Sequence, residues 1–185
     1  MRKKILFLAG MMACSSLAGA QEISKTWVAD KGNGTYQNPV LHADYSDPDI
    51  CAAGDDFYMT ASSFNCIPGI PILHSNDLVN WSLVNYALPV QEPEPFFDKA
   101  QHGKGVWAPA IRFHNGEFYI YWGDPDYGIY MIKTKDPKGK WSKPVLVKAG
   151  KGMIDATPLW DEDGKVYLIH AYAGSRSGVN KIGRA

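Results

Sequence analysis

Gly54-Asp-Asp-Phe-Tyr-Met59 is a short stretch that this chain repeats twice in altered form. The second copy is Asn115-Gly-Glu-Phe-Tyr-Ile120, and the third is Asp163-Gly-Lys-Val-Tyr-Leu168. Each copy places a polar, glycine-containing turn before aromatic and aliphatic residues, which is the pattern of a β-hairpin. The chain is therefore expected to contain three hairpins of the same kind.

A second element recurs at almost the same spacing. His74-Ser-Asn-Asp-Leu-Val-Asn-Trp-Ser82 is similar to Lys133-Thr-Lys-Asp-Pro-Lys-Gly-Lys-Trp-Ser142, so Trp81 and Trp141 lie 60 residues apart and are expected to be structural. Short strands at this period, without a long helical stripe, indicate β-propeller blades. A β-sandwich with coincidental turn spacing is the alternative, and two repeated elements at nearly one period favour the propeller.

The period and the chain length together predict an incomplete propeller. A propeller has four or more blades, each a small antiparallel sheet that cannot bury both faces alone. The third repeat unit begins near Met153, and the sequence of 185 residues ends at Ala185. We therefore expect an all-β chain that supplies roughly the first two to three blades of a longer propeller.

The charge and the aromatic content narrow the classes of partner. Lys plus Arg and Asp plus Glu both number 19, so the net charge is zero and gives no electrostatic argument for nucleic acid or an anionic membrane as a partner. Aromatic residues make up 12% of the chain, which suits either a β-rich core or a carbohydrate-binding surface.

The N-terminus has the pattern of a secretory signal peptide over residues 1–20. Basic residues 2–4 precede an apolar run, and Ala18-Gly19-Ala20 is a small-residue cleavage site. The apolar run is too short for a membrane span. Lipid attachment at Cys14 is a second, less favoured interpretation. The mature protein is expected to be exported, periplasmic or extracellular, with a polar lead over residues 21–37.

Two cysteines remain after such processing, Cys51 and Cys66. Two are too few for a disulfide framework, and we expect free, largely buried thiols. No Cys or His spacing matches a metal site, so we predict neither a metal nor a cofactor.

Asp47, in Tyr45-Ser-Asp-Pro-Asp-Ile50, has two interpretations from the residues alone. Asp before Pro is a common turn signal, because Asp bonds its own backbone and Pro fixes its own φ. The rigid Pro48 would also suit a carboxylate held in place for chemistry. The residues by themselves favour the turn.

Four segments resemble glycoside hydrolase family 43, enzymes that act on xylosides and arabinosides. They are residues 38–50, 54–81, 105–131 and 153–178, so the similarity runs from about Asn38 to Gly178. The resemblance implies a five-bladed β-propeller, of which residues 38–185 form part of the catalytic domain. It implies an inverting mechanism, in which the two catalytic carboxyls lie roughly 6.5–9.5 Å apart to leave room for a water.

The resemblance also implies roles for particular residues. Asp47 matches the general base, and Asp155 matches the aspartate that adjusts the pKa of the general acid and orients it. The acid itself is a glutamate that lies beyond Ala185 in the family pattern, so this chain is expected to lack it. Four glutamates of this chain do not match the acid, namely Glu92, Glu94, Glu117 and Glu162.

Three further residues are candidates for substrate binding. Phe64 matches a family position that lines the pocket. Trp107 is expected near the propeller axis as an apolar wall for the sugar, with a core position as the alternative. Arg176 could donate to a sugar hydroxyl or be an ordinary loop arginine. Asp124 and Asp126 could rim the site, but a role as turn residues is favoured.

These observations predict an exported hydrolase that cleaves terminal pentosides of plant cell-wall polysaccharide, with β-D-xylosidase first. An α-L-arabinofuranosidase is the close alternative, and a non-catalytic carbohydrate-binding propeller is the alternative from another class. The expected partner is a xylo-oligosaccharide or an arabinoxylan-derived substrate, with no nucleic acid and no membrane span.

Overall fold

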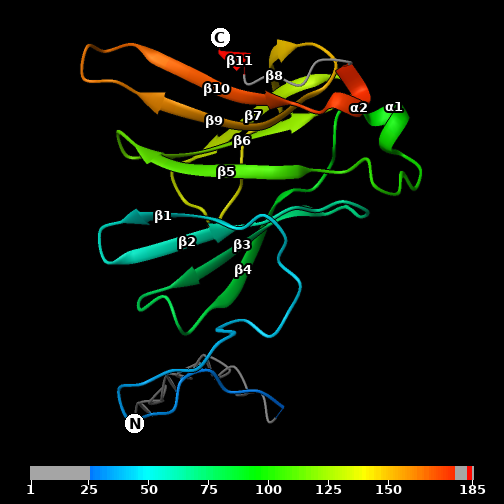
Figure 1. Ribbon diagram of the computed structural model, residues 1–185. Coiled ribbons are helices and arrows are strands. Elements are labelled where there is room, and N and C mark those ends of the chain that lie inside the picture. The colour runs from blue at the N-terminus through cyan, green and yellow to red at the C-terminus, as the bar shows by residue number, and fades with distance from the viewer. Residues whose placement is uncertain (1–25, 178–182, 185) are drawn as a thin grey trace, which may run out of the picture.

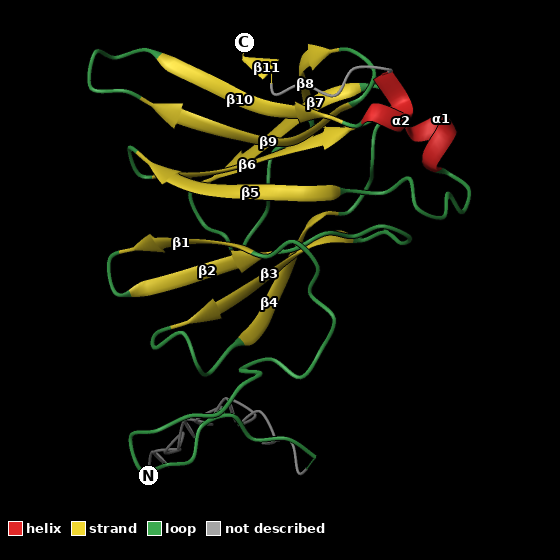
Figure 2. Ribbon diagram, viewed as in Figure 1, coloured by secondary structure: helices red, strands yellow, loops and turns green. Residues whose placement is uncertain are grey.

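The computed structural model describes residues 26–177, 183 and 184, which form three antiparallel sheets (Figures 1 and 2). The first sheet contains β1 (Asp49–Ala53), β2 (Asp56–Thr60), β3 (Gly69–Ser75) and β4 (Ser82–Leu88). The second contains β5 (Trp107–His114), β6 (Glu117–Asp124), β7 (Gly128–Thr134) and β8 (Val145–Ala149). The third contains β9 (Met153–Trp160), β10 (Val166–Tyr172) and β11 (Gly183–Arg184). Helices α1 (Glu94–Phe97) and α2 (Gly174–Ser177) have four residues each.

The all-β prediction is confirmed by these sheets, while the number of blades stays a prediction. The signal peptide predicted over residues 1–20 lies outside the described residues, and the lead is described from residue 26 onward. Within the described ranges, no helix is long and apolar enough to cross a membrane.

Each copy of the repeated hairpin occupies the same place in its sheet. The three copies connect the first strand to the second, as β1–β2, β5–β6 and β9–β10. In the second copy, Asn115 and Gly116 have φ of 49° and 78°, and His114 pairs with Glu117. Two consecutive positive φ values are what a two-residue type I′ turn requires, and Asn-Gly adopts them at little cost.

The second repeated element also occupies equivalent places, between the third and fourth strands of the first two sheets. The indole Nε1–H of Trp81 donates to the carbonyl of Leu78 over 3.0 Å. The indole of Trp141 donates in the same way to Pro137 over 3.3 Å. Both tryptophans therefore close the loop before the fourth strand, which is the structural role predicted for them.

Strands β6 and β7 of the middle sheet are largely buried on both faces. Successive side chains of a strand point to opposite faces, so Trp122 packs toward the first sheet and Tyr121 toward the third. Two separate clusters of buried residues follow, one on each face. The first includes Tyr58, Ile72, Ile120, Trp122 and Tyr130, and the second includes Tyr121, Ile129, Met153, Ala156 and Leu168. Because each sheet packs face to face on the next, the three sheets are stacked as blades are.

Cys66 corrects one expectation from the sequence. It is exposed, because it lies in the connection between β2 and β3, where the chain leaves the sheet. Cys51, in β1, is half-buried, and desolvation raises the pKa of its thiol to about 12.

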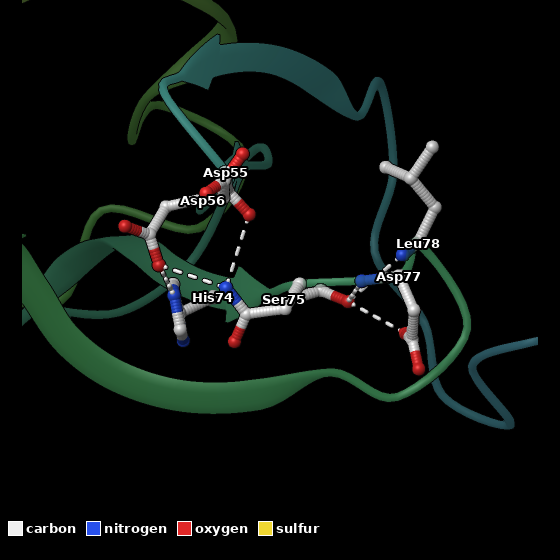
Figure 3. A network of polar contacts seen from close by, with 7 residues as sticks. Asp55, Asp56, His74, Ser75, Asp77 and Leu78 are labelled. Atoms are coloured by element: carbon white, nitrogen blue, oxygen red, sulfur yellow. Dashed lines mark hydrogen bonds and ion pairs between the residues drawn. The ribbon is translucent and has the colours of Figure 1, made fainter.

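A polar network holds the loop between β3 and β4 (Figure 3). The Oγ of Ser75 accepts hydrogen bonds from the backbone N–H groups of Asp77 and Leu78, and its hydroxyl donates to the Asp77 carboxylate. That carboxylate also accepts two hydrogen bonds from Asn80. The Asn80 side-chain bond is the largest of several that lower the pKa of Asp77, to about 2.

This network predicts a specific pH dependence of stability. The folded pKa of Asp77 lies below its ordinary value of 3.8, so its stabilising contribution is complete above about pH 4 and is lost as the pH falls toward about 2. Asp77→Asn should therefore lower the free energy of unfolding at pH 7 and have little effect near pH 2, as measured by urea titrations across the range.

Asp98→Asn is the control for that comparison. Asp98 is exposed, and its carboxylate makes no hydrogen bond within the described part of the chain. An effect of Asp77→Asn that is equal at pH 7 and at pH 2 would contradict the assignment.

Candidate active site

The site lies where the first strands of the three sheets meet. β1 contacts β5, and β5 contacts β9. The three strands run the same way, so their starting ends gather on one side of the molecule (Figure 1). Trp107 begins β5, Asp47 lies two residues before β1, and Asp155 is the third residue of β9. Residues far apart in the sequence are thus brought to one edge.

Both candidate aspartates have left-handed backbone near the start of the first strand of their sheet. Asp47 has φ of 51° and Asp155 has φ of 54°, values that are uncommon for residues other than glycine. Ala108, 61 residues after Asp47 and likewise followed by a proline, has φ of 36°. Strained conformations of this kind concentrate at functional sites. A residue with left-handed φ therefore lies at or near the start of each of the three first strands, and in two of the three cases this residue is an aspartate.

Hydrogen bonds hold Asp47 against the second sheet. Its Oδ2 accepts from the hydroxyl of Ser62 over 2.7 Å and from that of Ser46 over 3.1 Å. The same Ser62 Oγ accepts from the backbone N–H of Ala108 over 2.9 Å. Ser62 therefore links the Asp47 carboxylate to the start of β5. Its importance was not predicted from the sequence, because the link spans 46 residues.

Asp155 lies in a β-bulge. Thr157 pairs with Ile169 and Ile154 with Ala171, so two residues of β9, Asp155 and Ala156, oppose one residue of β10. A bulge redirects the side chains at its position, which suits a carboxyl turned toward a site. Neighbouring strand β6 lies close here, because a Cβ on Gly123 would come within 2.5 Å of the Met153 carbonyl oxygen.

The two carboxylates interact electrostatically. Desolvation raises the pKa of Asp155, and the negative charge of Asp47 raises it further. Asp155 also keeps an exposed surface. A charge raises the pKa of another carboxyl in this way only when it lies near that carboxyl. The structure thus brings together the two aspartates singled out from the sequence.

An aromatic pair comes from the two segments that meet at Ser62 and Ala108. The rings of Phe64 and Trp107 meet edge to face, with centroids 6.2 Å apart. The indole N–H of Trp107 donates to the Gly103 carbonyl over 3.0 Å, which fixes the ring. Both residues are half-buried, and each therefore keeps an exposed part. Aromatic faces of this kind bind the apolar face of a sugar ring.

Asp49 and Arg112 were not predicted as site residues. The Asp49 carboxylate accepts from the backbone N–H of Ile111 over 2.7 Å and from Arg112 Nη1. Arg112 Nη2 donates to the hydroxyl of Thr157 over 2.9 Å. One guanidinium on β5 thus reaches β1 on one side and β9 on the other.

The remaining candidates have other positions. Arg176 lies within α2, and its side chain is outside the described residues. Asp124 accepts the backbone N–H groups of Asp126 and Tyr127, which is the turn role expected of it. Glu117 accepts from Lys133 and from the hydroxyl of Tyr119. Within residues 26–177, 183 and 184, no three His, Cys, Asp or Glu side chains form a group that could hold a metal ion.

Comparisons with known proteins identify the family of this chain. A family model described as glycosyl hydrolases family 43 matches residues 36–183. A β-xylosidase of Formosa agariphila is 36% identical over 187 residues, which cover 93% of this chain and 31% of that protein. A non-reducing end α-L-arabinofuranosidase of Bacteroides ovatus is 38% identical over 139 residues, covering 73% of this chain and 26% of that protein.

Solved structures give the same result. A family 43 protein from Bacillus licheniformis superposes with a TM-score of 0.64 at 34% identity, covering 74% of this chain and 29% of that one. A xylan β-1,4-xylosidase from Bacillus halodurans superposes with a TM-score of 0.61 at 27% identity, covering 78% and 28%. The chain spans less than a third of the length of these relatives. Because the family model matches residues 36–183, which are most of this chain, the chain belongs to glycosyl hydrolase family 43.

Proposed function

We propose that the protein carrying this chain is an exported glycoside hydrolase that removes terminal pentose residues from plant cell-wall polysaccharide, with β-D-xylosidase as its first activity. The observation that carries the proposal is that the starts of β1 and β9 bring Asp47 near enough to Asp155 for its charge to raise the pKa of that carboxyl. The Phe64–Trp107 aromatic pair lies on the two segments that Ser62 and Ala108 join. Relatives named as xylosidases and as an arabinofuranosidase support the substrate class. The signal-like pattern of residues 1–20 supports export to the periplasm or the exterior.

In the proposed mechanism, hydrolysis passes through an oxocarbenium-like state and inverts the anomeric carbon. Asp47, held by Ser46 and Ser62, is the general base that takes a proton from the attacking water. Asp155 acts on the general acid, since a neighbouring carboxylate raises the pKa of an acid that must stay protonated. The acid is the glutamate that the family pattern places after residue 185. No metal or cofactor enters this scheme.

The test is hydrolysis of two chromogenic substrates, a β-D-xyloside and an α-L-arabinofuranoside, by the full reading frame that carries this chain. Faster release from the xyloside is the expected result, and proton NMR of the fresh product should show α-xylose before mutarotation, as inversion requires. Faster release from the arabinofuranoside would instead identify the alternative activity. No release by the folded protein, together with binding of xylo-oligosaccharide in calorimetry, would replace the enzyme by a non-catalytic sugar-binding propeller.

A further inference from the structure

The separation of the two carboxylates has to be set by something between the sheets that carry them. Asp47 precedes β1 in the first sheet, and Asp155 lies in β9 of the third, with β5 of the second sheet between. Neither aspartate belongs to the middle sheet, and the middle sheet's own copy of the left-handed position is Ala108. Their distance therefore depends on how β1 and β9 are attached to β5.

Arg112 attaches both strands at once. Its Nη1 donates to Asp49, two residues after Asp47, and its Nη2 donates to Thr157, two residues after Asp155. A guanidinium is planar, with donors in a fixed fork, so two partners held by its two terminal nitrogens are held at a fixed separation. Lysine carries the same charge on a single flexible nitrogen and does not define that separation.

The surroundings of Arg112 suit a geometric role rather than a large energetic one. About a third of its side chain, 35%, is exposed, and 29% of Asp49 is. Ion pairs with this exposure contribute little to folding stability. The Asp49 carboxylate, however, also accepts the backbone N–H of Ile111, so this end of the bridge is fixed to the β5 backbone as well. The thiol of Cys51 also interacts with the charges of Asp49 and Arg112, and its pKa is raised, mainly by desolvation.

We propose that Arg112 is a positioning residue that sets the distance between Asp47 and Asp155 by bridging Asp49 and Thr157 across β5. The inference rests on the proposed function for its consequence in catalysis, while the bridge itself can be tested without turnover. A misplacement of about 1 Å in a catalytic group can lower the rate by roughly 10²-fold. Loss of the bridge should therefore lower kcat and leave KM nearly unchanged.

The test is a cycle of variants of the full-length protein, with the titration of Asp155 as the readout. Carboxyl-carbon NMR with labelled aspartate follows Asp155, assigned by its disappearance in Asp155→Asn. In the otherwise unaltered protein, Asp47→Asn should lower the pKa of Asp155, because a raising charge is removed. When Arg112→Lys is also present, the change in the pKa of Asp155 caused by Asp47→Asn should be less than half as large as without it. When Thr157→Val is present instead, this change should be reduced by a smaller amount. Any direct effect of position 112 on Asp155 cancels in the cycle.

One control variant and one second bridge variant complete the test. Glu117→Gln breaks a salt bridge to Lys133 between β6 and β7. Glu117 pairs with His114, the last residue of β5, at the opposite end of that strand from Trp107, so this variant should leave the effect of Asp47→Asn unchanged. Thr157→Val keeps the side-chain shape and removes one arm of the bridge, so it decides the question if Arg112→Lys does not fold. The same effect of Asp47→Asn with and without the bridge would overturn the proposal, as would the absence of any effect in the unaltered protein.

The kinetic arm separates this inference from the proposed function. We expect Arg112→Lys to lower kcat on the chromogenic pentoside about tenfold or more, with KM changed less than about twofold. If the protein is inactive on both pentosides but the bridge variants still weaken the effect of Asp47→Asn on the pKa of Asp155, the proposed enzyme activity is wrong. Arg112 would then remain a positioning residue. An active protein with unchanged coupling would reject Arg112 alone.

Discussion

Asp47→Asn should lower kcat of the full-length protein by about 10³-fold on its preferred pentoside, because a general base contributes roughly 10²–10⁴-fold. The amide cannot accept the proton of the attacking water, although it can still accept the hydrogen bonds from Ser46 and Ser62. KM and thermal stability should change little. The measurement is steady-state kinetics on a chromogenic β-D-xyloside together with a circular dichroism melt.

Asparagine is the right replacement because of the backbone. Asp47 has φ of 51°, and Asn is among the residues that adopt left-handed φ most readily. Alanine would add backbone strain to the loss of the base. Asp44→Asn is the matched control, an exposed aspartate three residues earlier that the mechanism does not use. Retention of more than about a tenth of kcat by Asp47→Asn would reject the role of general base.

Gly105→Ala should destabilise the fold by roughly 2–3 kcal/mol, the cost of forcing extra atoms into a well-packed place. A Cβ at this position would lie 2.0 Å from the Ser63 carbonyl oxygen and 2.9 Å from the Phe64 carbonyl carbon. Both contacts are backbone, and Gly105 itself donates to Phe64 while Val106 pairs with Ser63. The two segments must therefore separate. Urea unfolding measures the loss.

The same substitution should also lower activity. Ser63 follows Ser62, which holds Asp47, and the displaced Phe64 is half of the aromatic pair with Trp107. Gly139→Ala is the control, because the nearest atom to its Cβ would be the flexible carboxylate of Asp136, at 2.9 Å. A loss of stability in Gly105→Ala no greater than in Gly139→Ala would show that the close approach at Gly105 is not required.

The repeated hairpins could be predicted from the sequence because their contacts are local. Asn115-Gly116 carries its own turn geometry, and the paired strands lie on either side of it. The loops closed by Trp81 and Trp141 are local in the same sense, since each indole bonds a carbonyl three or four residues earlier. Antiparallel sheets with this repeat follow from such patterns. The exposed position of Cys66 could not be predicted in this way. Free cysteines are usually buried, and only the path of the chain exposes this one.

The candidate site was only partly predictable. Asp47 and Asp155 were identified by resemblance to a family, and not by any local signal strong enough to separate them from turn residues. The period of 61 residues that joins Tyr58 to Tyr119 also joins Asp47 to Ala108, and this correspondence could have indicated a shared position in the blades.

The hairpins and the all-β class follow from local sequence patterns, and the two aspartates were singled out by resemblance to the family. The tertiary structure alone decided which residues meet: Ser62 with Asp47 and Ala108, and Arg112 with Asp49 and Thr157. The physical reason is the range of the contacts. Arg112 bonds partners 63 residues before it and 45 residues after it, and no local propensity encodes a hydrogen bond that forms only when three separate sheets have packed.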